Sequence, residues 1–260
     1  MIVRTPEERA GIIESGKRLA VILEHLEGMV RPGLSTMELE DTALRMIEAN
    51  GDLAAFKGYT PEGAQRAFPA ALCVSVNEEV VHGIPNEDPR TLKEGDIVSL
   101  DFGVVHAGLI TDSAATVRVG KVSKEADALI KATEHALEEG IRAAVVGNRI
   151  GDISSAIGAA FKGTGFSIVK VLGGHAVGRR VHEEPYISNF GHPGTGPEIV
   201  HGMVLALEPI ANMGKGTVII APDGYTYRSK DGSYSSHSEH TILIEDSGTT
   251  VVTRRPNERK

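Results

Sequence analysis

The strongest constraint on the fold of this chain is an internal repeat, in which local patterns recur in the same order in both halves. Each half begins with two helix-like segments separated by a short break, VRPGLST in the first and VGNRIGD in the second. Each then carries a His-x-x-Pro, at 82–85 and at 182–185. Ordered self-similarity of this kind indicates a duplicated α+β unit. No linker separates the halves, so we expect a single domain over 1–260, with repeat halves at about 5–120 and 121–250 and pseudo-twofold symmetry.

The repeat also places acidic residues at matching positions. GDIVSLD ends at Asp101 and GMVLALE ends at Glu208, and each run is followed by a return strand that begins with another acid, Asp112 or Glu239. If each pair flanks a hairpin, its two acids face each other across antiparallel strands, with Cβ atoms roughly 4.5–5.5 Å apart.

The turn positions support these two hairpins. The midpoint between Asp101 and Asp112 falls at residues 106–107, beside Gly108. The midpoint between the two glutamates falls at Asp223–Gly224, and Asp-Gly is among the strongest hairpin signals. We therefore predict that the acids lie in two opposed pairs.

Opposed acids in apolar strands require positive charge nearby, because like charges across a sheet repel and buried unpaired carboxylates are costly. A single strand acid usually lies on a solvated face, but two opposed pairs at equivalent places in a repeat are a different pattern. Lys or Arg partners are an alternative, although neither follows these acids at a matching position. Divalent cations fit better, since four carboxylates balance two such ions. Hard oxygen ligands with some imidazole suit Mn, Fe, Co or Zn.

Three of the ten histidines are candidates for this site. His175 lies in GGHAVG, where flanking glycines allow other chain segments to approach closely. His182 follows seven residues later, and His82 is its counterpart in the repeat. A lone histidine is more often structural than a ligand, so most of the ten should be ordinary residues. Those beside a metal centre that are not ligands are candidates for hydrogen bonds to substrate.

Composition excludes several classes of protein. The single cysteine rules out an intramolecular disulfide, which favours a reducing compartment. The chain contains no apolar run long enough to cross a membrane, and its first residues lack the apolar core of a signal peptide. The net charge of −8 argues against broad nucleic-acid binding, which needs a basic face. We therefore expect a cytoplasmic protein that binds neither membranes nor specific nucleic acids.

Capping signals predict where the first helices begin. Thr5 with Glu8 and Ser35 with Glu38 both match the capping-box pattern, and further helices are expected from near 123 and near 152. The C-terminal RRPNERK is expected to be a frayed tail.

These features together resemble a known family over nearly the full length. The motifs NEEVVHGIP (77–85), ITDSAATVRVG (110–120), GGHAVGRRVHEEP (173–185), GMVLALEP (202–209) and SEHTILI (238–244) are similar to those of the methionine aminopeptidases of the pita-bread fold, and the short N-terminus resembles the bacterial type I form. The resemblance implies an α+β pita-bread fold, a duplicated α/β unit with an antiparallel sheet and helices on its outer face.

The resemblance also implies a dinuclear centre. The ligand order in that family is Asp, Asp, His, Glu, Glu, which corresponds here to Asp101, Asp112, His175, Glu208 and Glu239. Asp112 and Glu239 would bridge two divalent ions per chain, Co, Mn, Fe or Zn.

The implied activity is removal of the N-terminal methionine from nascent proteins, preferably when the second residue is small. Glu208 would take a proton from the attacking water, and His82 and His182 would contact the scissile amide. We expect Tyr59, Phe68, Cys73 and Tyr225 to line the methionine pocket. The implied partners are nascent polypeptide N-termini, with a transient ribosome contact left open, and the expected state is a monomer. The rivals are an Xaa-Pro peptidase of the same fold and a pita-bread binding module that has lost catalysis.

Overall fold

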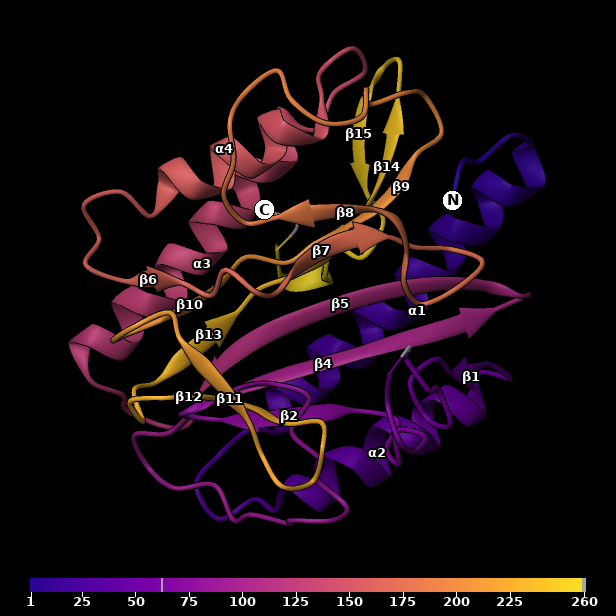
Figure 1. Ribbon diagram of the computed structural model, residues 1–260. Helices are drawn as coiled ribbons and strands as arrows, with labels where there is room; N and C mark the ends of the chain where they lie inside the picture. Colours follow the sequence, from indigo (N-terminus) through magenta and orange to yellow (C-terminus); the bar gives the residue numbers. More distant parts are fainter. Residues whose placement is uncertain (62, 259–260) are drawn as a thin grey trace.

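The computed structural model describes residues 1–61 and 63–258 of the chain. Its helices lie along one side of a set of antiparallel strands (Figure 1). The elements follow in the order α1 (Pro6–Met29), α2 (Thr36–Ala49), β1 (Leu53–Ala54), β2 (Cys73–Val76), β3 (Glu79–Val81), β4 (Ile97–His106), β5 (Leu109–Arg118), α3 (Lys124–Ala143), α4 (Ile150–Ala160), β6 (Ser167–Ile168), β7 (Gly173–Ala176), β8 (Glu183–Ser188), β9 (Val204–Leu207), β10 (Ile210–Asn212), β11 (Val218–Ile220), β12 (Tyr227–Ser229), β13 (Ser235–His237), β14 (His240–Glu245), β15 (Gly248–Val251) and the 3₁₀ turn η1 (Pro256–Glu258).

The helix starts follow from local capping. Ser35 and Glu38 form the predicted capping box at the start of α2. Thr5 caps α1 by accepting a hydrogen bond from the Glu8 backbone N–H at 3.2 Å. The predicted box at α1 is wrong in one respect, because the Glu8 carboxylate accepts from the backbone N–H of Arg4, at 2.8 Å, instead of that of Thr5.

Each pair of helices covers its own part of the sheets. Leu19, Leu23 and Leu26 of α1 are fully buried in a cluster with the apolar residues of α2, β2 and β4. Leu129, Ile130 and the other buried residues of α3 and α4 pack instead against β9 and β14. The repeat halves therefore contribute two apolar clusters, while the pseudo-twofold relation between the halves stays a prediction.

The first hairpin differs from its predicted register by two residues. β4 and β5 pair with Gly103 opposite Asp112 and Asp101 opposite Ala114. The predicted direct opposition of the two aspartates is wrong, because the turn lies at Ala107–Gly108, where both residues have positive φ. The aspartates are therefore diagonal neighbours on the same face of the ladder.

The second hairpin has the predicted centre. Three successive ladders, β9 with β14, β10 with β13 and β11 with β12, share one register around the turn at Asp223–Gly224. Their paired residues include Leu207↔His240, Ile210↔His237 and Ile220↔Tyr227. Glu208 and Glu239 lie one residue beyond the β9–β14 ladder, so this register places them opposite each other, as predicted.

The C-terminal segment is packed, which corrects the expectation of a frayed tail. The Arg255 side chain pairs with Glu27 of α1 at 2.9 Å, and the Asn257 backbone N–H donates to Glu24 at 2.7 Å. Charged residues at the chain end thus fasten η1 to α1, while residues 259 and 260 lie outside the described part of the chain. Over the described residues, no helix is both long and apolar enough to cross a membrane.

Candidate metal centre

The two hairpins meet at β5, which brings their acids together. The backbone N–H of Glu239 donates to the Ala114 carbonyl at 2.9 Å, and the Ser113 hydroxyl donates to the Glu239 carbonyl at 2.7 Å. One residue pair further along, Asp112 N–H donates to the Thr241 hydroxyl at 2.9 Å, and that hydroxyl donates back to the Asp112 carbonyl at 2.7 Å. These cross-links fix Asp112 of the first hairpin beside Glu239 of the second.

His175 enters the site from β7, whose close contact with β9 depends on glycine. A Cβ at Gly174 would lie 2.2 Å from the Ala206 carbonyl oxygen, so only glycine fits there. The Nδ1 atom of His175 lies 3.0 Å from the Ala176 carbonyl oxygen. Because a carbonyl only accepts, Nδ1 carries the proton and the Nε2 lone pair is free. Nε2 lies 3.5 Å from Glu208 Oε1, which is the orientation of a metal-ligating imidazole with its second nitrogen held by a backbone carbonyl.

The four carboxylates form a buried, strongly perturbed group. Asp101, Asp112 and Glu239 are 7%, 3% and 2% exposed. Burial, followed by the neighbouring Asp112 charge, raises the pKa of Asp101 and of Glu239 well above the ordinary range. Burial likewise raises the pKa of Glu208 well above its ordinary range and that of Asp112 to about 7. The protein alone therefore stabilises these groups in their neutral forms.

The side chains present fit a divalent cation. Ligand atoms of Asp112, His175 and Glu239 all lie within 4.8 Å of one another. Asp101 Oδ1 and Asp112 Oδ1 are buried without a hydrogen-bond partner, although native proteins rarely leave such atoms unsatisfied. No Lys or Arg is among the described residues that line the cavity. A cation would satisfy both oxygens and compensate the clustered charge.

His82 lies in a strained backbone conformation at the edge of this cavity. Its φ is +60°, in the left-handed region, and the next residue cannot be other than glycine, because a Cβ at Gly83 would lie 2.2 Å from the Val74 carbonyl oxygen. The Thr226 hydroxyl donates to the His82 carbonyl at 3.1 Å and stabilises this conformation. Burial, then the nearby His182, lowers the pKa of His82 to about 4, so the imidazole is neutral at physiological pH. Strain of this kind concentrates at functional sites.

His182 shares the cavity with the metal-site residues. Its ring centroid lies 4.6 Å from that of His175, and its Nδ1 lies 3.0 Å from the Tyr59 hydroxyl. Burial lowers the pKa of His182 below its ordinary value. The structure therefore places Tyr59, predicted as a pocket residue, in hydrogen-bond contact with His182.

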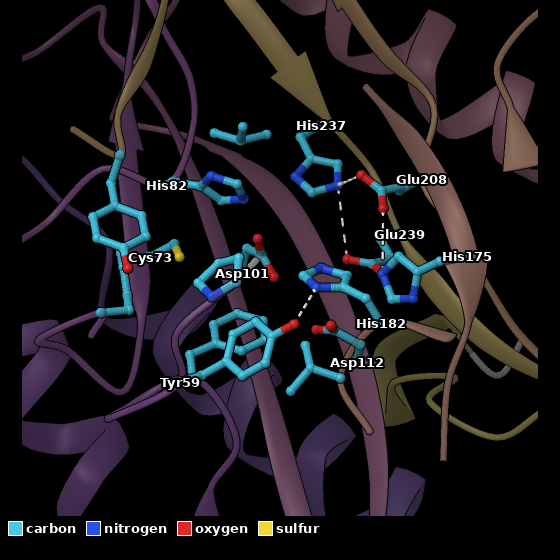
Figure 2. A pocket seen from close by; sticks show the side chains of 16 residues that line it. Tyr59, Cys73, His82, Asp101, Asp112, His175, His182, Glu208, His237 and Glu239 are labelled. Atoms are coloured by element: carbon cyan, nitrogen blue, oxygen red, sulfur yellow. Dashed lines mark hydrogen bonds and ion pairs between the residues drawn. The ribbon is translucent and has the colours of Figure 1, made fainter. Parts of the chain in front are cut away.

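The remaining predicted pocket residues form one small apolar cluster. Phe68, Cys73 and Tyr225 are all buried, and the rings of Phe68 and Tyr225 pack edge to face with centroids 5.2 Å apart. The Tyr225 hydroxyl donates to the Arg66 carbonyl, which ties Arg66 to this cluster. The same cavity reaches both this cluster and the carboxylates (Figure 2).

The sequence reasoning missed a fourth histidine of the site. His237 is 2% exposed, lines the cavity, and has its Nε2 3.8 Å from Glu208 Oε2 and 3.7 Å from Glu239 Oε2 (Figure 2). The available signal was its position two residues before Glu239, because alternate residues of an extended strand point to the same side.

The fold and this site together are those of a metal-dependent hydrolase, and comparison with known proteins places the chain more narrowly. The chain belongs to metallopeptidase family M24, whose family model matches residues 10–246.

Bacterial relatives match the chain over nearly all of its length. It is 41% identical over 254 residues to methionine aminopeptidase 1 of Bacillus subtilis, covering 98% of this chain and 99% of that protein. It is 42% identical over 254 residues to the Clostridium perfringens methionine aminopeptidase, covering 97% and 99%. The resemblance expected from the motifs is confirmed.

Solved structures confirm the pita-bread fold. The crystal structure of the Thermotoga maritima methionine aminopeptidase superposes with a TM-score of 0.92 at 39% identity, covering 98% of this chain and all of the other. The Xaa-Pro dipeptidase from Bacillus anthracis superposes with a TM-score of 0.71 at 20% identity, and the match covers 62% of its chain. The second likeness shows the shared fold alone.

Proposed function

We propose that the chain is a methionine aminopeptidase that removes the N-terminal methionine of new polypeptides, preferably ahead of a small second residue. The observation that carries this proposal is the shape of one cavity. Its walls are the clustered carboxylates with His175 at one end and the apolar group of Phe68, Cys73 and Tyr225 at the other. An apolar end beside a candidate metal centre suits a single flexible thioether side chain, which packs well in irregular apolar space.

We infer that Asp101, Asp112, His175, Glu208 and Glu239 hold two divalent ions, with Asp112 and Glu239 shared between them. Four carboxylates balance the charge of two such ions, and the oxygen-rich set with one imidazole suits Mn, Fe, Co or Zn. Ions bound there would lower the pKa of a water molecule and polarise the scissile carbonyl.

Side chains of the protein would then accept the proton of the water and hold the scissile amide in place. Glu208 is the proposed acceptor of the water proton, since it is the most exposed of the four carboxylates, with a side-chain exposure of 14%. His82 and His182 are neutral and donate hydrogen bonds to the scissile amide as charge develops on it. For His182, we assign the Tyr59 hydroxyl, 3.0 Å from Nδ1, as the donor, which would leave the proton on Nε2.

One tripeptide, Met-Ala-Ser, and one dipeptide, Ala-Pro, distinguish this activity from the Xaa-Pro peptidase and the binding module. With Mn²⁺ or Co²⁺, the protein is expected to release methionine from Met-Ala-Ser and to leave Ala-Pro intact, and chelation should stop the reaction. Cleavage of Ala-Pro alone would instead establish the Xaa-Pro peptidase, which the low identity to the solved Xaa-Pro dipeptidase disfavours. No cleavage of either peptide in the metal-loaded protein would identify a binding module.

Replacement of His182 by alanine is expected to lower kcat by about 100-fold or more, the usual cost of removing one donor to a developing oxyanion. Metal content should be unchanged, because we place His182 on the substrate. Elemental analysis and steady-state kinetics check both statements. Tyr59→Phe, which removes only the hydroxyl that contacts His182, is the matched control and should show a smaller loss. A fall of metal content by half in His182→Ala would make the residue a ligand.

We further propose that the enzyme acts as a monomer in the cytoplasm on nascent chain N-termini, with at most transient contact to the ribosome. The proposed activity supports the location, because nascent chains with an N-terminal methionine exist where translation occurs. Sedimentation of the purified protein tests the monomer, and co-sedimentation with ribosomes at several salt concentrations tests the contact.

A further inference from the structure

The backbone of His237 is held rigidly at the end of β13. His237 N–H donates to the Thr116 hydroxyl at 2.9 Å, and that hydroxyl donates to the His237 carbonyl at 2.8 Å. On the other side, His237 pairs with Ile210 of β10. These contacts fix the direction of its Cα–Cβ bond, so the ring points into the site because of the fold and not by chance rotation.

The ring itself lacks the hydrogen bonds that a buried imidazole needs. Both its nitrogens are buried without a hydrogen-bond partner. An imidazole ring carries at least one N–H donor. A buried donor left without an acceptor destabilises the folded state, so the N–H needs an acceptor.

The geometry around Glu208 identifies this acceptor. Each oxygen of the Glu208 carboxylate faces a different imidazole. Oε1 lies 3.5 Å from His175 Nε2, and Oε2 lies 3.8 Å from His237 Nε2 (Figure 2). His175 presents the lone pair of Nε2, because its Nδ1–H donates a hydrogen bond to a backbone carbonyl. His237 has no such hydrogen bond, so it is free to carry its proton on Nε2.

His237 offers one nitrogen to two carboxylates, with Nε2 3.8 Å from Glu208 Oε2 and 3.7 Å from Glu239 Oε2. Five other residues already form the proposed ligand set, so a hydrogen bond to a carboxylate is the more suitable role for His237. We propose that His237 is a positioning residue whose Nε2–H donates to Glu208 Oε2 and fixes the orientation of this carboxylate in the ion-loaded site. This inference rests on the proposed function, in which Glu208 accepts a proton from water.

Outer partners of this kind typically change metal affinity or activity by about 10–100-fold when removed. His237→Leu and His237→Asn should therefore lower kcat by about 10–100-fold with little change in KM. Both should bind the same number of Mn²⁺ ions per chain as the wild type, with weaker affinity by titration calorimetry. His237→Gln should recover most of kcat and affinity, because the glutamine amide reaches the position of Nε2, whereas the shorter asparagine amide does not.

The control is His106→Gln, which replaces a half-buried histidine paired with Asp52 at 2.7 Å, outside the cavity. It should leave kcat and Mn²⁺ binding unchanged. Loss of an ion in His237→Leu would make His237 a ligand and overturn the proposal, as would a rise of KM alone or equal behaviour of the Gln and Asn variants. Calorimetry does not depend on turnover, so a wild type that fails to cleave Met-Ala-Ser would refute the proposed function while leaving the binding comparison interpretable.

Discussion

Glu239→Gln is expected to abolish cleavage of Met-Ala-Ser and to release at least one of the two proposed ions. A carboxylate oxygen of Glu239 lies within 4.8 Å of ligand atoms of Asp112 and His175. The Glu239 backbone is fixed to the first hairpin by its hydrogen bond to the Ala114 carbonyl. The substitution removes the negative charge that the two proposed ions would share while keeping the shape of the side chain. The fold should survive, since the backbone hydrogen bonds to β5 do not involve the carboxylate. Elemental analysis measures the metal content, circular dichroism tests the fold, and steady-state kinetics measures the cleavage of Met-Ala-Ser.

Glu245→Gln is the matched control for this variant. Glu245 ends β14, the same strand that follows Glu239, but its carboxylate pairs with Arg9 at 2.7 Å on the outside of the molecule. It should retain full activity and the same metal content as the wild type. If Glu239→Gln turned over substrate at the normal rate with normal metal content, the assignment of Glu239 as a bridging ligand would be wrong.

Divalent ions are expected to stabilise the fold, and more strongly at higher pH. In the metal-free protein the pKa of Asp112 is raised to about 7, and those of Asp101, Glu208 and Glu239 are raised well above their ordinary range. Since unfolded carboxyls titrate near pH 4, the folded protein binds more protons than the unfolded chain above that pH. The stability that these groups contribute is complete below about pH 4 and is lost as pH rises through each folded pKa, which for Asp112 is about 7.

The cavity histidines have the opposite linkage. The pKa of His82 is lowered to about 4, and those of His175 and His237 to about 3, so their contribution is lost as pH falls below about 6.5. A comparison between pH 6.5 and pH 8 is weighted toward the carboxylates, because about half of the unfolded imidazoles are already neutral at pH 6.5. Over that interval the metal-free melting temperature should fall on account of this site.

Divalent ions bound to the carboxylates are expected to take the place of the protons and to prevent this loss of stability at higher pH. A ligand at about 100 times its dissociation constant adds about 2.7 kcal/mol to the free energy of unfolding. For a chain of this size that corresponds to a rise of roughly 5–10 °C in melting temperature. The rise produced by Mn²⁺ should be larger at pH 8 than at pH 6.5, because protons compete for the ligands at lower pH, and chelation should reverse it.

The double variant Asp101→Asn with Asp112→Asn tests whether the carboxylate charges cause the effects of pH and Mn²⁺ on stability. It removes two of the four repelling groups, so its metal-free form should lose less stability between pH 6.5 and pH 8 and should gain little from Mn²⁺. Equal Mn²⁺-induced shifts in the double variant and the wild type would place the stabilising ions elsewhere in the molecule.

The sequence by itself determined much of this protein, because the relevant signals are local. Capping residues such as Ser35 locate helix starts through contacts within one turn. The Asp223–Gly224 turn determined the register of three successive ladders, since a hairpin register follows from the position of its turn. The motifs also predicted the candidate ligands, and the structure brings Asp112, His175 and Glu239 together. Their roles, like the pseudo-twofold repeat, stay predictions.

Only the tertiary structure decided the features that depend on contacts distant in sequence. The turn at Ala107–Gly108 shifted the first hairpin by two residues, because Ala107 adopts a positive φ that no local rule assigns to alanine. The cross-links from Asp112 to Thr241 bring the hairpins together across 129 positions of sequence. His237 joined the site for the same reason, because its direction is set by Thr116, 121 positions earlier. Sequence patterns record which face of a strand a residue occupies, whereas the residues that meet across sheets are chosen by packing and hydrogen bonding of the folded chain.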